Sequence, residues 1–213
     1  MARIREFDEQ KALTEAMHVF WEKGYEATSL SDLTSRMGIQ KPSLYAAYGD
    51  KLSLFESALR NYNQLHAKSV RLKLNKITSV KTAFRLLFLE GAFPNGSHER
   101  NGCFCINTMV ELAPRDAKFE ILTREHQQYL AAIFEDTLER GVTSGEIDGS
   151  INCRAIAQSL MVAFIGITVL KKSNPNREWI DNCIDSALSL LTAPPRREPD
   201  VDDLFSKETP PIK

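Results

Sequence analysis

Two cysteines separated by a single residue stand out among the side chains that could do chemistry. Cys103 and Cys105 lie in the segment NGCFCINTMVELAP at positions 101–114. An oxidant-sensing thiol needs access and a lowered pKa, and Arg100 together with a helix N-terminus could lower the pKa of Cys103. Because residues two apart on a helix point about 200° away from each other, we do not expect these thiols to form a disulfide. Buried, inert thiols are the alternative interpretation.

The rest of the chain offers these cysteines neither a catalytic base nor further metal ligands. A cysteine nucleophile needs a positioned base such as histidine, and the four histidines are scattered at positions 18, 66, 98 and 126. No histidine or cysteine lies four residues beyond either thiol, the spacing that places two ligands on one face of a helix. We therefore expect no enzyme, no cofactor and no metal site.

A second group of polar side chains, in IQKPSLYAAYGDKLSLF at positions 39–55, suits nucleic acid. Glutamine can pair bidentately with adenine, and lysine can reach guanine or a phosphate. Serine and tyrosine hydroxyls bond phosphate oxygens, which fixes register without reading sequence. Free N–H groups at helix N-termini also bind phosphate. The candidate DNA-contacting residues are Thr28, Ser29, Gln40, Lys41, Ser43, Tyr45, Tyr48 and Lys51.

The elements that must position these residues form a predicted helix-turn-helix at 29–48. Ser29 and Asp32 have the spacing of a capping box, which starts a short helix. Gly38 falls where the turn requires a positive φ, and Pro42 can occupy the first turn of the next helix. The second helix of such a unit can enter the major groove of DNA.

Helical periodicity recurs along almost the whole chain, while strand signals are nearly absent. We therefore expect an all-α fold of about nine helices. Asp8 can cap the first helix and Gly24 can end it. A fourth helix is expected to follow Gly49-Asp50. Later helices are expected near 101–113, 116–140, 152–172 and 176–192.

Composition places the chain among soluble globular proteins, with 43% hydrophobic and 26% charged residues. No apolar run approaches the roughly 20 residues that span a bilayer, and the N-terminus lacks a secretory signal. We therefore expect a cytoplasmic protein whose four cysteines are free thiols. The net charge of −1 gives no direct argument for a nucleic-acid partner. Residues 28–51 hold three cations and two anions, so one chain alone should bind DNA weakly.

The segment KPSLYAAYGDKLSLF, with Gly24-Tyr25 and Thr28 upstream, closely resembles the DNA-binding domain of TetR-type (tetracycline-repressor-like) transcriptional regulators. The resemblance covers roughly residues 6–66, and residues 101–114 resemble the start of the sensor domain in a subset of these regulators. Two positions depart from the pattern, because Thr34 replaces a small alanine and Tyr48 replaces the commoner phenylalanine. Neither change threatens the fold, and the Tyr48 hydroxyl could touch a phosphate.

The resemblance implies a homodimeric regulator, most simply a repressor, that binds a palindromic operator and is released by a small-molecule inducer. It implies a DNA-binding domain at 1–50, a helical ligand-sensing and dimerisation domain at 51–192, and a tail at 193–213. That tail holds five prolines in 21 residues and is expected to be disordered. The resemblance also implies that five residues face DNA, namely Lys41, Ser43, Tyr45, Tyr48 and Lys51. A thiol-based redox or electrophile sensor using Cys103 and Cys105, and a ligand-independent helix-turn-helix module, remain alternatives.

Two further sets of residues are candidates for the sensor domain. The inducer pocket should lie among the middle helices, although each candidate could equally be a core or structural residue: Leu59, Tyr62, His66, Phe84, Phe88, Phe104, Asn107, Thr108, Glu111 and Phe164. The last two helices carry apolar stripes that could cover their own domain or, as the resemblance implies, pack as a four-helix bundle with a second chain. The dimer candidates are Ile156, Leu160, Ala163, Ile167, Ile180, Ile184, Leu188 and Leu191.

Overall fold

The computed structural model describes residues 7–93 and 101–192, and these ranges form nine α-helices with no strand. This confirms the all-α prediction. The predicted tail at 193–213, Arg100 and His98 lie outside the described residues. The helices are α1 (Glu9–Lys23), α2 (Leu30–Met37), α3 (Lys41–Tyr48), α4 (Lys51–Lys76), α5 (Val80–Ala92), α6 (Phe104–Glu111), α7 (Ala117–Thr143), α8 (Cys153–Leu170, with a 3₁₀ turn at Lys171–Ser173) and α9 (Arg177–Ser189).

The predicted start and stop signals of the first helices are present as hydrogen bonds. The Asp8 carboxylate accepts from the Lys11 amide at 3.0 Å and caps α1. The capping box of α2 is complete, because the Asp32 amide donates to Ser29 Oγ at 3.0 Å and the Ser29 amide donates to Asp32 Oδ2 at 2.9 Å. Gly38 has φ 67° and ψ 29°. Its left-handed conformation turns the chain from α2 into α3.

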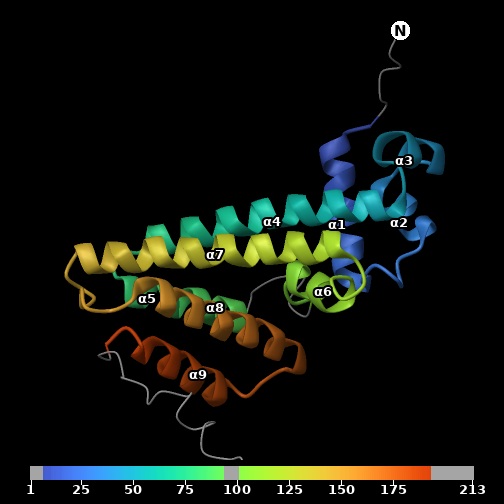
Figure 1. Ribbon diagram of the computed structural model, residues 1–213. Helices are drawn as coiled ribbons and strands as arrows, with labels where there is room; N and C mark the ends of the chain where they lie inside the picture. The colour runs from blue at the N-terminus through green and yellow to red at the C-terminus, as the bar shows by residue number, and fades with distance from the viewer. Residues whose placement is uncertain (1–6, 94–100, 193–213) are drawn as a thin grey trace, which may run out of the picture.

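The long helices α4 and α7 lie side by side and run in the same direction (Figure 1). Helices α1, α2 and α3 gather at one end of this pair, and α5, α8 and α9 lie beneath its other half, with α9 outermost. Ion pairs join the long helices at both ends of their contact, between Glu56 and Lys118 at 2.8 Å and between Arg71 and Asp136 at 3.7 Å. Helices α4 and α7 therefore extend together from the end that holds α1–α3 to the other end of the molecule.

The buried residues form two clusters, and the boundary between them does not fall at residue 50. One cluster joins α1–α3 and the first half of α4 to α6 and the start of α7. Phe55 lies at its centre, with ring centroids 4.9 Å from Phe20, 5.2 Å from Phe104 and 5.4 Å from Phe119. The other cluster joins the second half of α4 to α5, α7, α8 and α9. Helix α6 therefore shares a core with the helix-turn-helix.

The apolar stripes predicted on α8 and α9 point into the second cluster. Leu160, Ile167, Ile180, Ile184, Leu188 and Leu191 are buried, and Ile156 and Ala163 pack partly buried against them. The interpretation in which each stripe covers its own domain describes these contacts. The large exposed apolar side chains are not among the predicted dimer residues. They are Val162 and Val169 on α8, Trp179 on α9 and Leu190 directly after α9.

Helix α8 also differs from the expectation about apolar runs. Together with its 3₁₀ turn it is long and apolar enough to cross a membrane by length and composition, and 33% of its most apolar window is buried inside the chain. The helix itself agrees with the one predicted at 152–172, but its capacity to span a bilayer was not predicted. Gln158 and Ser159 interrupt the apolar residues, so no unbroken run in the sequence reaches the length that spans a bilayer.

Candidate nucleic-acid interface and internal cavity

Helix α3 is anchored by one side and exposed on the other, at the outer end of the molecule (Figure 1). Leu44 is fully buried in the core that α3 shares with α1, α2 and α4, whereas Gln40, Lys41 and Ala46 are exposed and Tyr45 is 47% exposed. Gln40 occupies the N-cap position without a side-chain capping bond. The exposed edge of α3 thus carries the amide of Gln40, the ammonium of Lys41 and the phenol of Tyr45. Ala46 lies beside them and was not among the predicted DNA-contacting residues.

Three of the predicted DNA-contacting hydroxyls are instead bonded within the protein. The Tyr48 hydroxyl donates to the Glu9 carbonyl at 2.9 Å, so it ties α3 to α1. Thr28 is 2% exposed and donates to the Gly24 carbonyl at 2.6 Å. Ser29 belongs to the capping box of α2. These residues hold α2 and α3 in place, and Ser43, which is half-buried, lies at the margin of the exposed edge.

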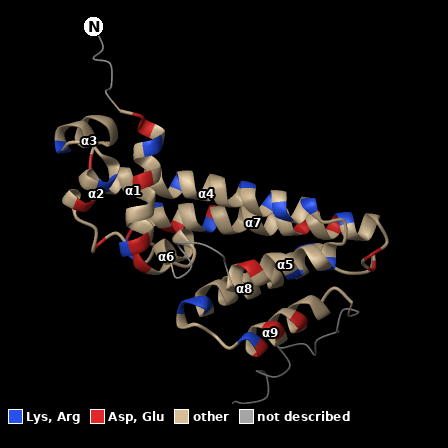
Figure 2. Cartoon of the chain, turned by 180° about the vertical axis from the view of Figure 1, so that it is seen from behind, with Lys and Arg blue, Asp and Glu red and all other residues tan. Residues whose placement is uncertain are grey.

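Charges of both signs surround this surface, as Figure 2 shows on α1–α3. Hydrogen bonds from Lys23 and then Ser29 hold the pKa of Asp32 well below its usual range. Lys51 Nζ lies 4.3 Å from the centroid of the Tyr25 ring, a cation–π contact that fixes this lysine at the start of α4. The lysine therefore stands at a helix N-terminus, where a phosphate is favoured.

Glu111, a candidate pocket residue, binds the turn between α1 and α2. Its carboxylate accepts the amides of Tyr25 at 3.1 Å and Glu26 at 3.0 Å. Gly24 precedes them with φ 82° and ψ 175°, and a Cβ there would lie 3.0 Å from Glu111 Oε2. Helix α6 is thereby fastened to the turn before α2 by a carboxylate that lies close to this glycine.

The other end of α6 is fastened to the connection before it and to the end of α8. Asn107 Nδ2 donates to the Asn101 carbonyl at 2.8 Å, and Lys172 Nζ donates to Asn107 Oδ1 at 2.6 Å. Trp21 of α1 donates from Nε1 to the Gly102 carbonyl at 3.2 Å. Asn107, like Glu111, therefore makes structural hydrogen bonds at a surface groove and does not line the internal cavity described next.

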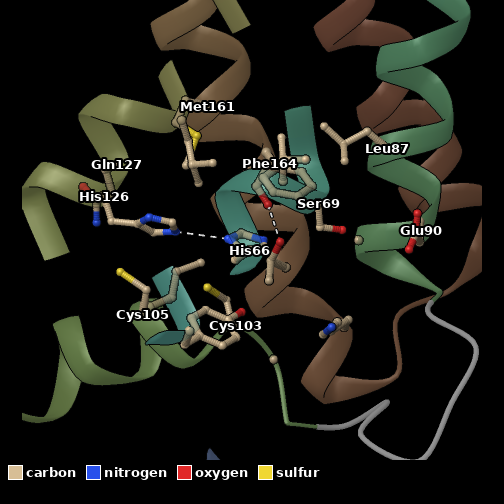
Figure 3. A pocket seen from close by; sticks show the side chains of 18 of the residues that line it. His66, Ser69, Leu87, Glu90, Cys103, Cys105, His126, Gln127, Met161 and Phe164 are labelled. Carbon is tan, nitrogen blue, oxygen red and sulfur yellow. Dashed lines mark hydrogen bonds between the residues drawn. The ribbon is translucent and has the colours of Figure 1, made fainter. Parts of the chain in front are cut away.

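A cavity of about 210 Å³ lies between α4, α5, α6, α7 and α8 (Figure 3). Of the predicted pocket residues, Tyr62, His66 and Phe164 line it. Leu59, Phe84, Phe88, Phe104 and Thr108 are fully or almost fully buried in the two cores. The structure adds His126, Cys103, Cys105 and Lys171 to the lining.

Two histidines meet inside this cavity, although they are 60 residues apart in the sequence. His66 Nδ1 lies 3.1 Å from His126 Nε2, a contact drawn in Figure 3. Burial lowers the pKa of His66 to about 3, with further lowering by His126 and the cations Lys73 and Lys171, and burial lowers the pKa of His126 to about 4. Both imidazoles are therefore neutral at pH 7, and one N–H is shared between them.

Both thiols of the Cys-Phe-Cys segment line the same cavity, contrary to the expectation that they point apart. The helix begins at Phe104, so Cys103 is an N-cap residue with φ −101° and ψ 126° and does not follow helical geometry. The thiols are 7% and 1% exposed, and burial raises the pKa of both. All four cysteines are free. Because the thiolate is the reactive form, these thiols are unreactive in this conformation.

The local geometry of α2 and α3 defines a helix-turn-helix DNA-binding protein. A capped helix, a left-handed glycine and a short helix with one exposed edge are the parts of such a unit. The helix-turn-helix is attached to a helical body that contains a cavity, and α6 of this body bonds the turn between α1 and α2. Within the described ranges, no group of three His, Cys, Asp or Glu side chains is placed to hold a metal ion.

Comparison with known proteins gives the family. Residues 12–58 match the model for bacterial regulatory proteins of the tetR family, and residues 90–184 match the model for a tetracyclin repressor-like C-terminal domain. The chain is 34% identical over 193 residues to an uncharacterized HTH-type transcriptional regulator of Bacillus subtilis (strain 168), YezE, covering 90% of this chain and 100% of that protein. The chain therefore belongs to the TetR family of transcriptional regulators.

Two further relatives resemble the chain over most of its length. The HTH-type transcriptional repressor ComR of Escherichia coli (strain K12) is 28% identical over 192 residues, which are 88% of this chain and 90% of that protein. The solved structure of a cysteine-substituted TetR family regulator, CifR, in complex with 26-bp double-strand operator DNA is 30% identical. It superposes with a TM-score of 0.70 over 88% of this chain and 98% of that chain.

Proposed function

We propose that this regulator is a repressor that binds a palindromic operator as a homodimer and leaves it when a small molecule fills the internal cavity. The exposed edge of α3 carries the proposal, because Gln40, Lys41 and Tyr45 are presented together on a helix whose other side is fixed by Leu44. The solved complex of the similar regulator CifR with double-strand operator DNA supports a DNA-binding role. Such a protein acts in the cytoplasm.

We assign base contacts to Gln40 and Lys41, and backbone contacts to Ser43, Tyr45 and Lys51. Glutamine and lysine near the start of a recognition helix can reach adenine and guanine in the major groove. The hydroxyls and the ammonium of Lys51 can bond phosphates. Thr28, Ser29 and Tyr48 act indirectly, because their hydroxyls keep α2 and α3 in the orientation that presents these groups.

The proposed dimer face is the exposed side of α8 and α9. On α8 five of the exposed residues follow the helical spacing of a single stripe: Ala155, Ser159, Val162, Gly166 and Val169. A Cβ added to Gly166 would meet no atom within 4 Å, so a second helix could approach closely there. Trp179 is 54% exposed on α9. A two-fold pairing through this face would present two α3 helices to half-sites about 34–36 Å apart, or a multiple of that distance.

The route from the cavity to DNA runs through α6 in this proposal. The start of the helix contributes Cys105 and Ile106 to the cavity, and its last residue, Glu111, holds the turn before α2. A ligand that displaces the start of α6 would therefore move the turn as well. A ligand releases DNA only to the extent that it prefers the released state, and typical couplings give about 5- to 150-fold.

A variant pair tests the DNA surface directly. We expect K41A/Y45A to lose at least about tenfold in affinity for a duplex selected from a random pool, since a good base contact contributes about 1–3 kcal/mol. K68A/Y129A removes the same residue types from exposed sites on α4 and α7 and should bind like the wild type. The proposal is wrong if folded K41A/Y45A retains full affinity. A selected site without two-fold symmetry would contradict the dimeric docking.

Thiol-based sensing is the second candidate, because Cys103 and Cys105 line the cavity that a small electrophile would enter. An electrophile would first have to loosen this packing, since the buried thiols are protonated. If C103S and C105S released DNA on treatment with peroxide or an electrophile as the wild type does, this candidate would be excluded. A cysteine-nucleophile enzyme is disfavoured, because both thiols are buried and burial raises the pKa of each.

A further inference from the structure

The cavity contains one cation that no carboxylate of the described residues neutralises. Three charged side chains line it, namely Lys73, Glu90 and Lys171. Lys73 forms an ion pair with Glu90, which leaves the half-buried ammonium of Lys171. Burial lowers the pKa of Lys171; Cys103 raises it by a smaller amount, and the neighbouring cation Lys172 lowers it. An ammonium in such surroundings is destabilised until a negative charge reaches it.

The histidine pair adds a hydrogen-bond donor to the same space. Two neutral imidazoles carry two N–H groups, and one of these is used in the contact between His66 and His126. The other N–H lies on His126 Nδ1 or on His66 Nε2, depending on which ring donates in the contact. Lys171, His66 and His126 line the same cavity, and the charge of Lys171 lowers the pKa of His66.

The remaining walls are apolar and limit the size of a ligand. Val70, Leu87, Leu130, Met161 and Phe164 line the cavity. Its volume of about 210 Å³ lies below the roughly 300–1,000 Å³ of sites for drug-sized ligands. A small molecule with one polar end and a short apolar body therefore fits the cavity.

We propose that the cavity binds a small organic monoanion, a carboxylate on a short aliphatic or aromatic body, through the Lys171 ammonium and the N–H of the His66–His126 pair. This inference rests on the proposed function, because it names the class of molecule that fills the effector cavity. A carboxylate matches one ammonium in charge. A phosphate ester would bring close to two negative charges to a single cation, and an amine would add a second cation beside Lys171.

Four carboxylates, each compared with its own primary amide, test the charge. The probes are benzoate, phenylacetate, cinnamate and hexanoate at millimolar concentration, with binding measured by thermal unfolding and by calorimetry on the full chain. We expect at least one acid to stabilise the protein and to bind about 10- to 100-fold more tightly than its amide, the range of a charge-assisted hydrogen bond.

Variants of two adjacent lysines test the site. K171M should lose about tenfold or more in affinity for the acid, and K171R should retain most of it. K172M is the matched control, because Lys172 bonds Asn107 at the surface groove and does not line the cavity. K172M should bind the acid as the wild type does, which separates a specific contact from a general loss of positive charge.

Three results would overturn the assignment: no acid binds, the amides bind as well as the acids, or K171M binds the acid like the wild type. Operator affinity, measured on the same wild-type preparation, separates this inference from the proposed function. A protein that binds its duplex but ignores all four acids refutes the ligand class alone. A protein that binds an acid but no palindromic duplex refutes the repressor proposal alone.

Discussion

The carboxylate that Glu111 places on the turn between α1 and α2 should be a measurable source of stability. Replacing Glu111 by alanine removes the acceptor of the Tyr25 and Glu26 amides, at 3.1 and 3.0 Å, without changing the buried core. Helix α6 would lose its polar connection to this turn. We expect the turn between α1 and α2 to open more readily as a result.

The magnitude follows from the two bonds and their exposure. A hydrogen bond to a charged group contributes about 1.5–3 kcal/mol. Glu26 is exposed and Tyr25 only partly buried, so water can replace part of the loss. We therefore expect E111A to lower the free energy of unfolding by about 1–3 kcal/mol in total. For a protein of this size each kcal/mol corresponds to about 2–4 °C in Tm.

Urea unfolding and amide hydrogen exchange together measure this effect. Exchange at Tyr25 and Glu26 should accelerate in E111A and stay unchanged in E125A, which removes an exposed glutamate from α7. Gly24→Ala provides a double-mutant cycle. Its positive φ costs about 1–3 kcal/mol in any background, but the contact at 3.0 Å with Glu111 disappears in E111A.

The cycle should therefore yield a coupling of at least about 0.5 kcal/mol, with G24A less costly in the E111A background. Additive costs would mean that the cost of G24A comes from the positive φ alone and not from the contact with Glu111. An unchanged urea midpoint for E111A, with unchanged exchange at the two amides, would refute the reasoning entirely. In that case water would satisfy the turn as well as the carboxylate does.

Three other perturbations address the phosphate contact, the dimer face and the histidine pair. Lys51→Ala should weaken binding to all duplexes similarly and reduce the slope of log affinity against log salt by about 1 per chain, measured by anisotropy. Val162→Arg should give a folded monomer in sedimentation, whereas Leu160→Ala should leave the dimer but cost about 2–5 kcal/mol of stability; a dimeric V162R would contradict the proposed face. The lowered pKa values of His66 and His126 mean that the unfolded chain binds more protons below pH 6.5, so the contribution of this pair to stability should be constant above pH 7 and fall toward pH 5, by up to about 2 kcal/mol per histidine. The H66Q/H126Q variant should flatten that profile in urea titrations, and an equally steep profile would assign the loss to other groups.

The helix-turn-helix could be predicted from the sequence because its signals are local. The capping box at Ser29 and Asp32, the left-handed Gly38 and the early Pro42 each constrain only a few neighbouring residues. The capping hydrogen bonds and helix bounds agree with those signals. The assignment of DNA contacts was less complete, since nothing local indicates that the Tyr48 hydroxyl reaches α1.

The cavity could not be predicted because it depends on the register of distant helices. His66 meets His126 only because α4 and α7 lie side by side in parallel, and no spacing within either helix encodes that register. The direction of the Cys103 thiol depends on where α6 begins, which is at Phe104 and not near residue 101 as expected. On α8 the difficulty was different. Apolar residues lie on both sides of this helix, with Leu160 buried and Val162 exposed, so periodicity alone could not say which stripe turns inward.

The ring cluster around Phe55 bears on how such a regulator can be recombined. Phe55 packs on Phe20 from the first helix and on Phe104 and Phe119 from the body. A chimera that joins a foreign operator-reading module at residue 50 would split this cluster between two parents that never coevolved. A graft that takes all four aromatic residues from one parent keeps the ring contacts that join the first helix to the rest of the chain.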